Sequence, residues 1–209
     1  MIHHLILASG SPRRKELLSQ LGLDFETIPS NIPETETPGE PHEAFVKRLA
    51  ELKAEHIGNK RKTSFVIGAD TIVVLGPKRL GKPGSKEEAK GMLESLSGRR
   101  HEVLTGIAIV RSGSGFRQVD SERTEVWFKN LSPSEIENYV ETPEPYDKAG
   151  SYGIQGTGAS FVERIEGDVT NIIGLPLNRL RKLLEKAGFN FPPECDLPAL
   201  KVKGYQIPY

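Results

Sequence analysis

The chain has 209 residues, enough for one domain with a sizeable core, and its 28 basic and 28 acidic side chains give a formal net charge of zero. The balanced charge argues against a basic surface for nucleic acid, and a single cysteine, Cys195, excludes a disulfide framework and a cysteine-based zinc site. No apolar run reaches the length of a membrane span and the N-terminal residues do not predict a signal peptide, so we expect a cytoplasmic enzyme or binding protein.

The spacing of apolar residues predicts strands that alternate with helices. Ser11 and Pro12 are typical of a helix start, and Ser85 with Glu88 predicts a capping box at another. This alternation predicts an α/β fold with a mixed central sheet and flanking helices. The expected strands are 5–8, 25–30, 64–75, 101–112, 122–131 and 160–167, the expected helices are 12–21, 43–56, 85–98, 133–140 and 175–188, and turns are expected at 76–79 and 113–120.

The segment after the last expected helix is interrupted by prolines and irregular. We therefore predict one domain at 1–188 and an irregular C-terminal tail at 189–209. The tail is too apolar for a solvated segment, so we expect it to pack on the body or on a second subunit. The residues that carry this expectation are Phe189, Phe191, Leu197, Leu200, Tyr205 and Ile207.

Two adjacent arginines, Arg13 and Arg14, fall in the first turn of the helix expected at 12–21. Cations at this positive end of the helix dipole are disfavoured by about 0.3–1 kcal/mol each. A bound anion would remove the conflict, because a helix N-terminus offers free N–H groups to phosphate oxygens.

Asp70 interrupts the most apolar strand of the chain, although aspartate is depleted in strands. A buried carboxylate must be paired, coordinated or protonated. Two interpretations stay open on local features: a structural aspartate bonded to backbone amides, or a metal ligand or general base.

Four further residues are ambiguous when taken singly. Glu34 lies in a polar loop and could be an ordinary surface charge, and Lys53 could be an ordinary helix residue. Lys82 in "GKPG" could be a charge in a turn, and Gln155 in "GIQG" could belong to a flexible loop. The two lysines and Glu34, together with the arginine pair and Asp70, suit a polyphosphate with a divalent cation. The N-terminus of the helix and the basic side chains would bind phosphate oxygens, and the two carboxylates would hold the metal.

The sequence lacks GxxxxGK[ST], HExxH and GxSxG, and "GIQGTG" does not match GxGxxG. Its own motifs resemble the Maf family of nucleoside triphosphate pyrophosphatases, also described as septum-formation inhibitors. The resemblance runs from about residue 5 to about residue 184. The motifs that carry it are "LASGSPRRKELL", "RLAELKA", "VIGADTIV", "GKP", "LSGRRHEVLTG" and "YDKAGSYGIQG…GLPL".

The resemblance implies a mixed α/β fold similar to the inosine triphosphate pyrophosphatases (Maf/Ham1), with two lobes around a cleft. It implies hydrolysis of a nucleoside triphosphate to the monophosphate and pyrophosphate, with Mg²⁺ or Mn²⁺, and a homodimer. Asp70 falls on the catalytic base. Other site positions of the family fall on Arg13, Glu34, Lys53, Lys82 and Gln155.

Three positions separate substrate subgroups within the family. The dTTP/UTP subgroup carries Arg, Thr and Gln, and this chain has Arg13, Thr71 and Gln155. The 7-methyl-GTP subgroup carries Trp, Gln and Glu instead. The chain departs from the family pattern at Pro33, where an acid is frequent, and at Val169, where an aromatic residue is common.

We therefore expect a cytoplasmic dTTP/UTP pyrophosphatase that neither binds nucleic acid nor enters membranes. Glu34 and Asp70 are expected to hold the metal, and Gln155, Arg13 and Thr71 to shape the base pocket. The residues expected to neutralise the triphosphate are Arg13, Arg14, Lys53 and Lys82. Two alternatives are a nucleotide-sensing regulator of cell division that acts without turnover, and an enzyme for modified pyrimidine nucleotides.

Overall fold

The computed structural model describes residues 4–191, which form two compact units. The first unit holds residues 4–71, 105–122 and 174–191, and the second holds residues 72–104 and 123–173. Two units agree in number with the two lobes that the family resemblance implies.

The strands of the described chain form one mixed sheet. Their bounds are β1 (Leu5–Leu7), β2 (Phe25–Thr27), β3 (Phe65–Leu75), β4 (Lys78–Leu80), β5 (Arg100–Arg111), β6 (Phe116–Phe128) and β7 (Val162–Glu166). The strand order is β2-β1-β3-β5-β6-β7, and β4 pairs with β3. β1 is parallel to β2 and β3, whereas β4 runs antiparallel to β3 and β7 runs antiparallel to β6. The mixed sheet confirms the expected fold class.

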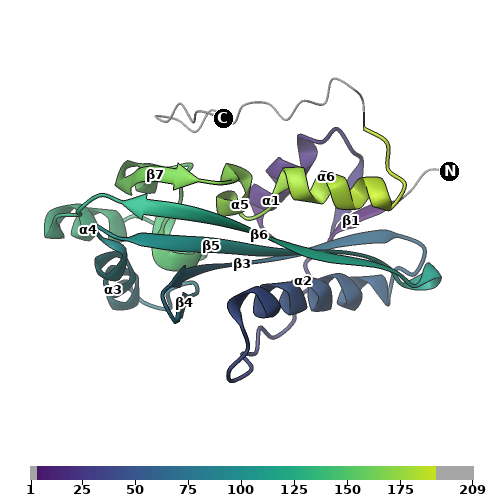
Figure 1. The fold of residues 1–209 in the computed structure, drawn as a ribbon, viewed down its shortest axis with the longest axis horizontal. Coiled ribbons are helices and arrows are strands. Elements are labelled where there is room, and N and C mark those ends of the chain that lie inside the picture. The colour runs from purple at the N-terminus through teal and green to yellow at the C-terminus, as the bar shows by residue number, and fades with distance from the viewer. Residues whose placement is uncertain (1–3, 192–209) are drawn as a thin grey trace. The chain divides into compact units, whose positions relative to one another are not determined.

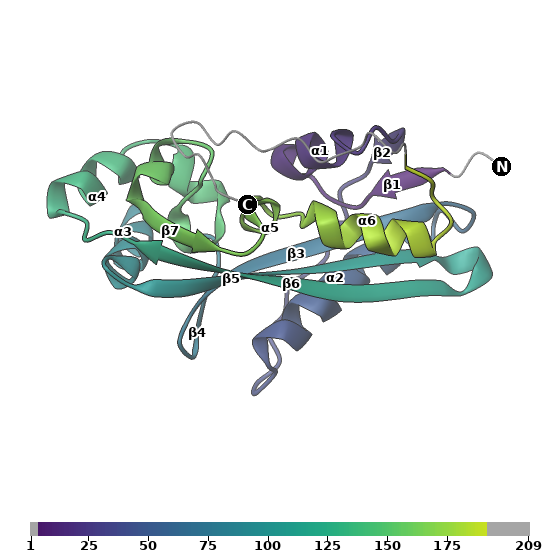
Figure 2. The ribbon, with the colours of Figure 1, turned by 45° about the horizontal axis from the view of Figure 1, so that its top comes forward.

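The α-helices of the described chain are α1 (Pro12–Ser19), α2 (His42–Gly58), α3 (Lys86–Leu96), α4 (Pro133–Val140), α5 (Val169–Ile173) and α6 (Leu177–Lys186). In the first unit, α2 covers one face of the strands and α1 and α6 cover the other (Figures 1 and 2). The segment 142–161 of the second unit contains short 3-10 helices, η2 (Glu144–Asp147), η3 (Ala149–Ser151) and η4 (Thr157–Phe161). It contains neither α-helix nor strand, because its glycines and prolines disfavour both.

Helix α2 lies unusually close to the sheet at two glycines of the first unit. A Cβ atom at Gly68 would lie 2.0 Å from the carbonyl oxygen of Ala50, and one at Gly106 would lie 2.1 Å from that of Val46. Any larger side chain at either position would push the helix away. The helix and strands share an apolar core, whose buried members are Ile6, Ala8, Ala50, Ala54, Ile57, Val66, Ala108 and Val110.

The helix starts follow the sequence signals closely. Ser11 caps α1 by accepting a hydrogen bond from the backbone N–H of Arg14, and Ser132 caps α4 in a complete capping box. Ser85 caps α3, but the carboxylate of Glu88 accepts from the N–H of Gly84, one residue before the cap. The expected capping box of α3 is therefore only half formed.

Three elements differ most from the sequence-based expectation. Residues 76–79 were expected as a turn, but the turn is short and β4 begins at Lys78. Strand β6 begins at Phe116 rather than at 122. Its first half is mostly half-exposed and carries polar residues, so the sequence lacks the apolar alternation that would predict a strand there. Helix α5 was not expected, since its five residues are too few to produce a helical period.

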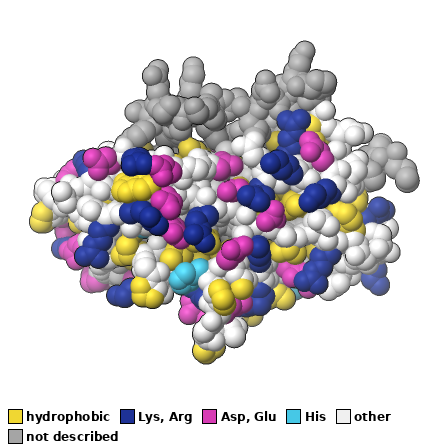
Figure 3. All heavy atoms as spheres, in the orientation of Figure 1, with side chains coloured by type: hydrophobic (Ala, Val, Ile, Leu, Met, Phe, Trp, Pro, Cys, Tyr) yellow, Lys and Arg dark blue, Asp and Glu magenta, His cyan; other side chains and the backbone are white. Residues whose placement is uncertain are grey.

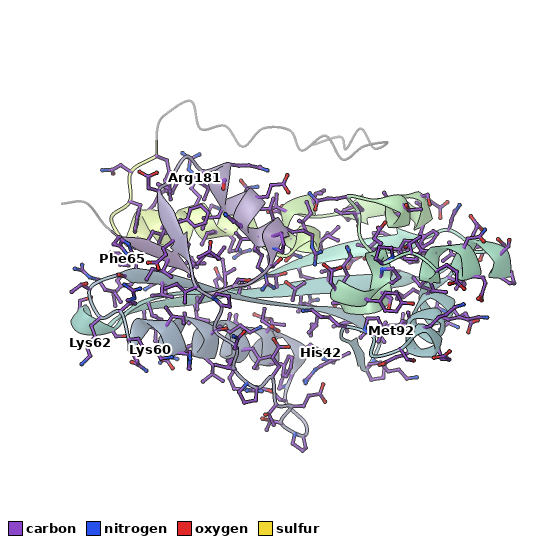
Figure 4. The ribbon with its side chains drawn as sticks, turned by 180° about the vertical axis from the view of Figure 1, so that it is seen from behind. His42, Lys60, Lys62, Phe65, Met92 and Arg181 are labelled. Atoms are coloured by element: carbon purple, nitrogen blue, oxygen red, sulfur yellow. The ribbon has the colours of Figure 1, made fainter. Side chains whose placement is uncertain are left out.

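The start of the expected tail packs on the first unit. Phe189 is buried and meets Phe65 edge to face, with ring centroids 5.3 Å apart. The guanidinium of Arg181 lies 5.2 Å from the ring centroid of Phe191, and Figure 4 labels both Phe65 and Arg181. The other apolar residues on which the tail prediction depends lie outside the described residues.

Basic and acidic side chains are mixed on the face presented in Figure 3, in keeping with the zero net charge. No helix within residues 4–191 is long and apolar enough to cross a membrane.

Candidate functional site

Strand β3 places an acid inside the protein. Asp70 is only 4% exposed, because β3 lies between β1 and β5 and is buried along most of its length. A carboxylate buried in this way requires partners.

Lys53 supplies the partner of Asp70 from helix α2. Its ammonium nitrogen lies 2.6 Å from Asp70 Oδ1 and 2.6 Å from Glu34 Oε1. Glu34 reaches this point from the loop between β2 and α2, and its side chain is 57% exposed. The ammonium therefore joins two carboxylates that are 36 residues apart in the sequence, and it is itself buried.

Arg14 turns inward from the first turn of α1. It donates hydrogen bonds from Nε to the carbonyl oxygen of Gly174 over 2.8 Å, from Nη1 to Ser9 Oγ over 3.3 Å, and from Nη2 to Thr71 Oγ1 over 3.0 Å. Burial lowers the pKa of the Arg14 guanidinium, and the negative charge of Asp70 opposes that shift most strongly. Arg14 thus belongs to the same electrostatic site as the carboxylates.

Thr105 is a member of the site that sequence reasoning missed. It is fully buried on β5, and its hydroxyl oxygen lies 2.9 Å from the hydroxyl oxygen of Thr71. Thr105 lies in the "LTG" of the motif "LSGRRHEVLTG", which is part of the family resemblance. A threonine in a strand is common, however, so the residue type alone does not indicate a functional role.

The remaining predicted residues are distributed between the two units. Arg13 lies half-buried in the first turn of α1, and its positive charge contributes to the lowered pKa of Arg14. Lys82 and Gln155 belong to the second unit, where both are exposed: Lys82 between β4 and α3, and Gln155 between η3 and η4. The structure thus brings together Arg14, Glu34, Lys53, Asp70 and Thr71.

No group of three or more His, Cys, Asp or Glu side chains within residues 4–191 forms a ready-made metal centre. The pair formed by Glu34 and Asp70 matches instead the way Mg²⁺ is usually held, by one or two carboxylates together with substrate phosphates. A cationic helix start beside two carboxylates can therefore receive a phosphorylated ligand and a divalent cation.

The architecture defines the class of fold. A HAM1 protein from Coxiella burnetii aligns over 88% of this chain and 99% of its own, with a TM-score of 0.50 and 18% identity. The Ham1 protein of Staphylococcus aureus aligns over the same shares with a TM-score of 0.51 and 16% identity. The chain therefore has a Ham1-like mixed α/β fold.

The sequence gives the family. Residues 4–187 match the family described as Maf-like protein, and the chain belongs to this family. A relative from Thermoanaerobacter sp. (strain X514), named dTTP/UTP pyrophosphatase, is 52% identical over 184 residues, which cover 87% of this chain and 95% of the relative. A protein of the same name from Halalkalibacterium halodurans is 48% identical over 188 residues, which cover 89% and 97%.

Proposed function

We propose that this protein hydrolyses dTTP and UTP to the nucleoside monophosphate and pyrophosphate. The observation that carries the proposal is the cluster of Glu34, Lys53 and Asp70 beside the half-buried Arg14. The cluster lies in a chain whose relatives at 46–52% identity are named dTTP/UTP pyrophosphatase.

Glu34 and Asp70 would hold a divalent cation, Mg²⁺ or Mn²⁺, jointly with the triphosphate. The donor set fits, because both side chains offer hard carboxylate oxygens around one point that a cationic group already occupies. Such a cation neutralises charge that develops on the phosphate oxygens.

Asp70 would act as the general base. Its carboxylate would accept the proton of a water molecule that attacks the α-phosphorus, while the bond from the α-phosphorus to the bridging oxygen breaks and pyrophosphate leaves. Arg13, Arg14, Lys53 and Lys82 would neutralise the triphosphate. Gln155, with Arg13 and Thr71, would select the base.

The test measures pyrophosphate release from UTP, dTTP and 7-methyl-GTP with Mg²⁺ or Mn²⁺. We expect UTP and dTTP to be the better substrates. In ¹⁸O-water the label is expected in the monophosphate and not in pyrophosphate. Label in pyrophosphate, or orthophosphate as the product, would contradict attack at the α-phosphorus.

A nucleotide-sensing regulator of cell division is the second candidate, since the Maf family resemblance includes septum-formation inhibitors. A variant without turnover that still arrests division would favour it.

Cytoplasmic location, a homodimer and action as one domain over residues 1–188 also stay predictions. Fractionation, light scattering and the cooperativity of unfolding test them.

A further inference from the structure

The ammonium of Lys53 lies where a cation that joins Glu34 and Asp70 would lie. Its nitrogen is 2.6 Å from one oxygen of each carboxylate, and the side chain is 10% exposed. The carboxylate of Asp70 is buried and that of Glu34 is exposed, and two negative charges near one point repel one another, so a cation between them stabilises the pair. In this structure the cation between the two carboxylates is the ammonium of Lys53.

A divalent cation bound to the same two oxygens would meet a positive charge at contact distance. Like charges this close repel strongly where water is largely excluded. Lys53 and the metal therefore compete for Glu34 and Asp70. The burial of Asp70 and Lys53 makes this competition stronger than it would be at the surface.

The ammonium has another set of ligands available once a triphosphate is bound. Lys53 has a flexible four-carbon stem and three rotatable N–H donors, and phosphate oxygens accept such donors well. Arg14 cannot move in the same way, because three of its donors bond to Gly174, Ser9 and Thr71. Of these two cations, only Lys53 is bound solely to the carboxylates that a metal needs.

We propose that Lys53 is an internal counter-ion that blocks the metal site until the triphosphate draws its ammonium away. This inference rests on the proposed function. It makes metal binding depend on the nucleotide, and by linkage it makes nucleotide binding depend on the metal. Lys53 thereby disfavours the binding of metal to the protein in the absence of nucleotide.

The experiment measures Mn²⁺ binding to the protein without nucleotide, by titration calorimetry and electron paramagnetic resonance. Lys53→Met keeps the alkyl stem and removes the charge. We expect it to bind Mn²⁺ at least ~10-fold more tightly than wild type, because the competing charge is gone. Lys47→Met, which removes a half-exposed lysine paired with Glu43 on the same helix, is the matched control and should leave Mn²⁺ binding unchanged.

Two further variants keep the result interpretable. Adding Asp70→Asn to Lys53→Met should abolish the gain in Mn²⁺ affinity, since the gain requires the freed carboxylate. Lys53→Gln replaces Lys53→Met if the latter does not fold, because its amide still donates to one carboxylate. In EDTA, the non-hydrolysable α,β-methylene UTP should bind Lys53→Met at least ~10-fold more weakly than wild type, since an ammonium–phosphate contact is lost.

Folded variants at Lys53 that bind Mn²⁺ no better than wild type would overturn the inference, as would unchanged binding of the analogue in EDTA. The proposed function has a separate readout. If wild type releases pyrophosphate from UTP but the Lys53 variants gain no Mn²⁺ affinity, only this inference fails. If the variants gain affinity but wild type releases no pyrophosphate, only the proposed function fails.

Discussion

Arg14 holds the hydroxyl of Thr71: its Nη2 donates a hydrogen bond to Thr71 Oγ1 over 3.0 Å. The same hydroxyl oxygen lies 2.9 Å from that of Thr105. Thr71 was expected to shape the base pocket, yet its polar atom is used inside the protein. The hydroxyl of Thr71 therefore helps to fix the guanidinium of Arg14.

Thr71→Val tests this relationship at constant side-chain size. The substitution leaves one donor of Arg14 and the buried hydroxyl of Thr105 without the Thr71 partner, at an expected cost of about 1–3 kcal/mol in the free energy of unfolding. Thr71→Ser keeps the hydroxyl and should cost less than half as much. Urea unfolding monitored by circular dichroism measures both. Equal losses in the two variants would contradict a role for the hydroxyl.

Asp70→Asn keeps the volume of the side chain but removes the base and the charge that faces Lys53. We expect turnover of UTP to fall at least ~100-fold while the far-ultraviolet circular dichroism spectrum stays unchanged. Asp24→Asn, at an exposed position of the same unit, is the control and should turn over normally. Near-normal turnover by Asp70→Asn would remove Asp70 from the catalytic role.

The sequence predicted most of the fold because its local signals are strong. Serine caps, glycines after helices and β-branched runs place α1, α3, α4, β1 and β3 nearly where they lie. Strand β4 and the first half of β6 are polar and exposed or half-exposed, so they carry no apolar alternation. Only pairing with a neighbouring strand reveals them, and pairing is not a local property of sequence.

The sequence predicts most residues of the site, but not the contacts between them. An aspartate is unusual inside an apolar strand, and two arginines are unusual at the positive end of a helix dipole, so both features can be recognised in the sequence. Nothing local indicated that Lys53 would join Glu34 to Asp70, or that Arg14 and Thr105 would share Thr71. Each of these contacts joins different elements, and only the folded sheet brings them together.

We expect the buried side chain of His101 to make the free energy of unfolding depend on pH. Burial lowers its pKa to about 4, and its ring nitrogen Nε2 lies 2.7 Å from the hydroxyl of the buried Tyr152. Between pH 4 and about 6.5 the unfolded chain binds a proton at this histidine and the folded chain does not. Stability therefore rises with pH across this window and is lost as pH falls through it, by up to about 3 kcal/mol.

The measurement compares urea unfolding of wild type and His101→Gln from pH 4 to pH 8. The glutamine keeps a hydrogen bond to Tyr152 but does not titrate, so its stability should vary less below pH 6.5. His56→Gln, at an exposed position of α2, should keep the wild-type profile. Parallel curves for wild type and His101→Gln would show that His101 does not cause the dependence.

Phe189 predicts that the segment after α6 contributes to stability. Its ring is 9% exposed and packs edge to face on Phe65. Phe189→Ala should lower the free energy of unfolding by about 3 kcal/mol, whereas Phe189→Leu should cost about 1 kcal/mol. Asn190→Ala changes the exposed neighbour and is the control. The proposed substrate preference should stay the same in all three, because Phe189 packs on the start of β3, away from Asp70.

Base selectivity gives the most specific prediction. The amide of Gln155 can donate and accept, which suits the N3–H and carbonyl oxygens of uracil and thymine. A glutamate there would accept two hydrogen bonds from guanine and would repel the carbonyl oxygens of uracil. 7-Methylguanine is cationic, so tryptophan at position 13 would attract it through a cation–π contact, whereas Arg13 repels it. Wild type should therefore prefer UTP and dTTP to 7-methyl-GTP.

Arg13→Trp combined with Gln155→Glu should reverse this preference in part. Adding Thr71→Gln should complete the reversal at a cost in stability, because a longer side chain must displace the contacts that Thr71 makes with Arg14 and Thr105. The effects on kcat/KM should be non-additive, since all three positions are expected to act on one ligand. The comparison needs kcat/KM for UTP, dTTP and 7-methyl-GTP in wild type, both single variants at 13 and 155, the double and the triple. A wild type that already prefers 7-methyl-GTP would show that these three positions do not set the base, while the assignment of pyrophosphatase activity would stand.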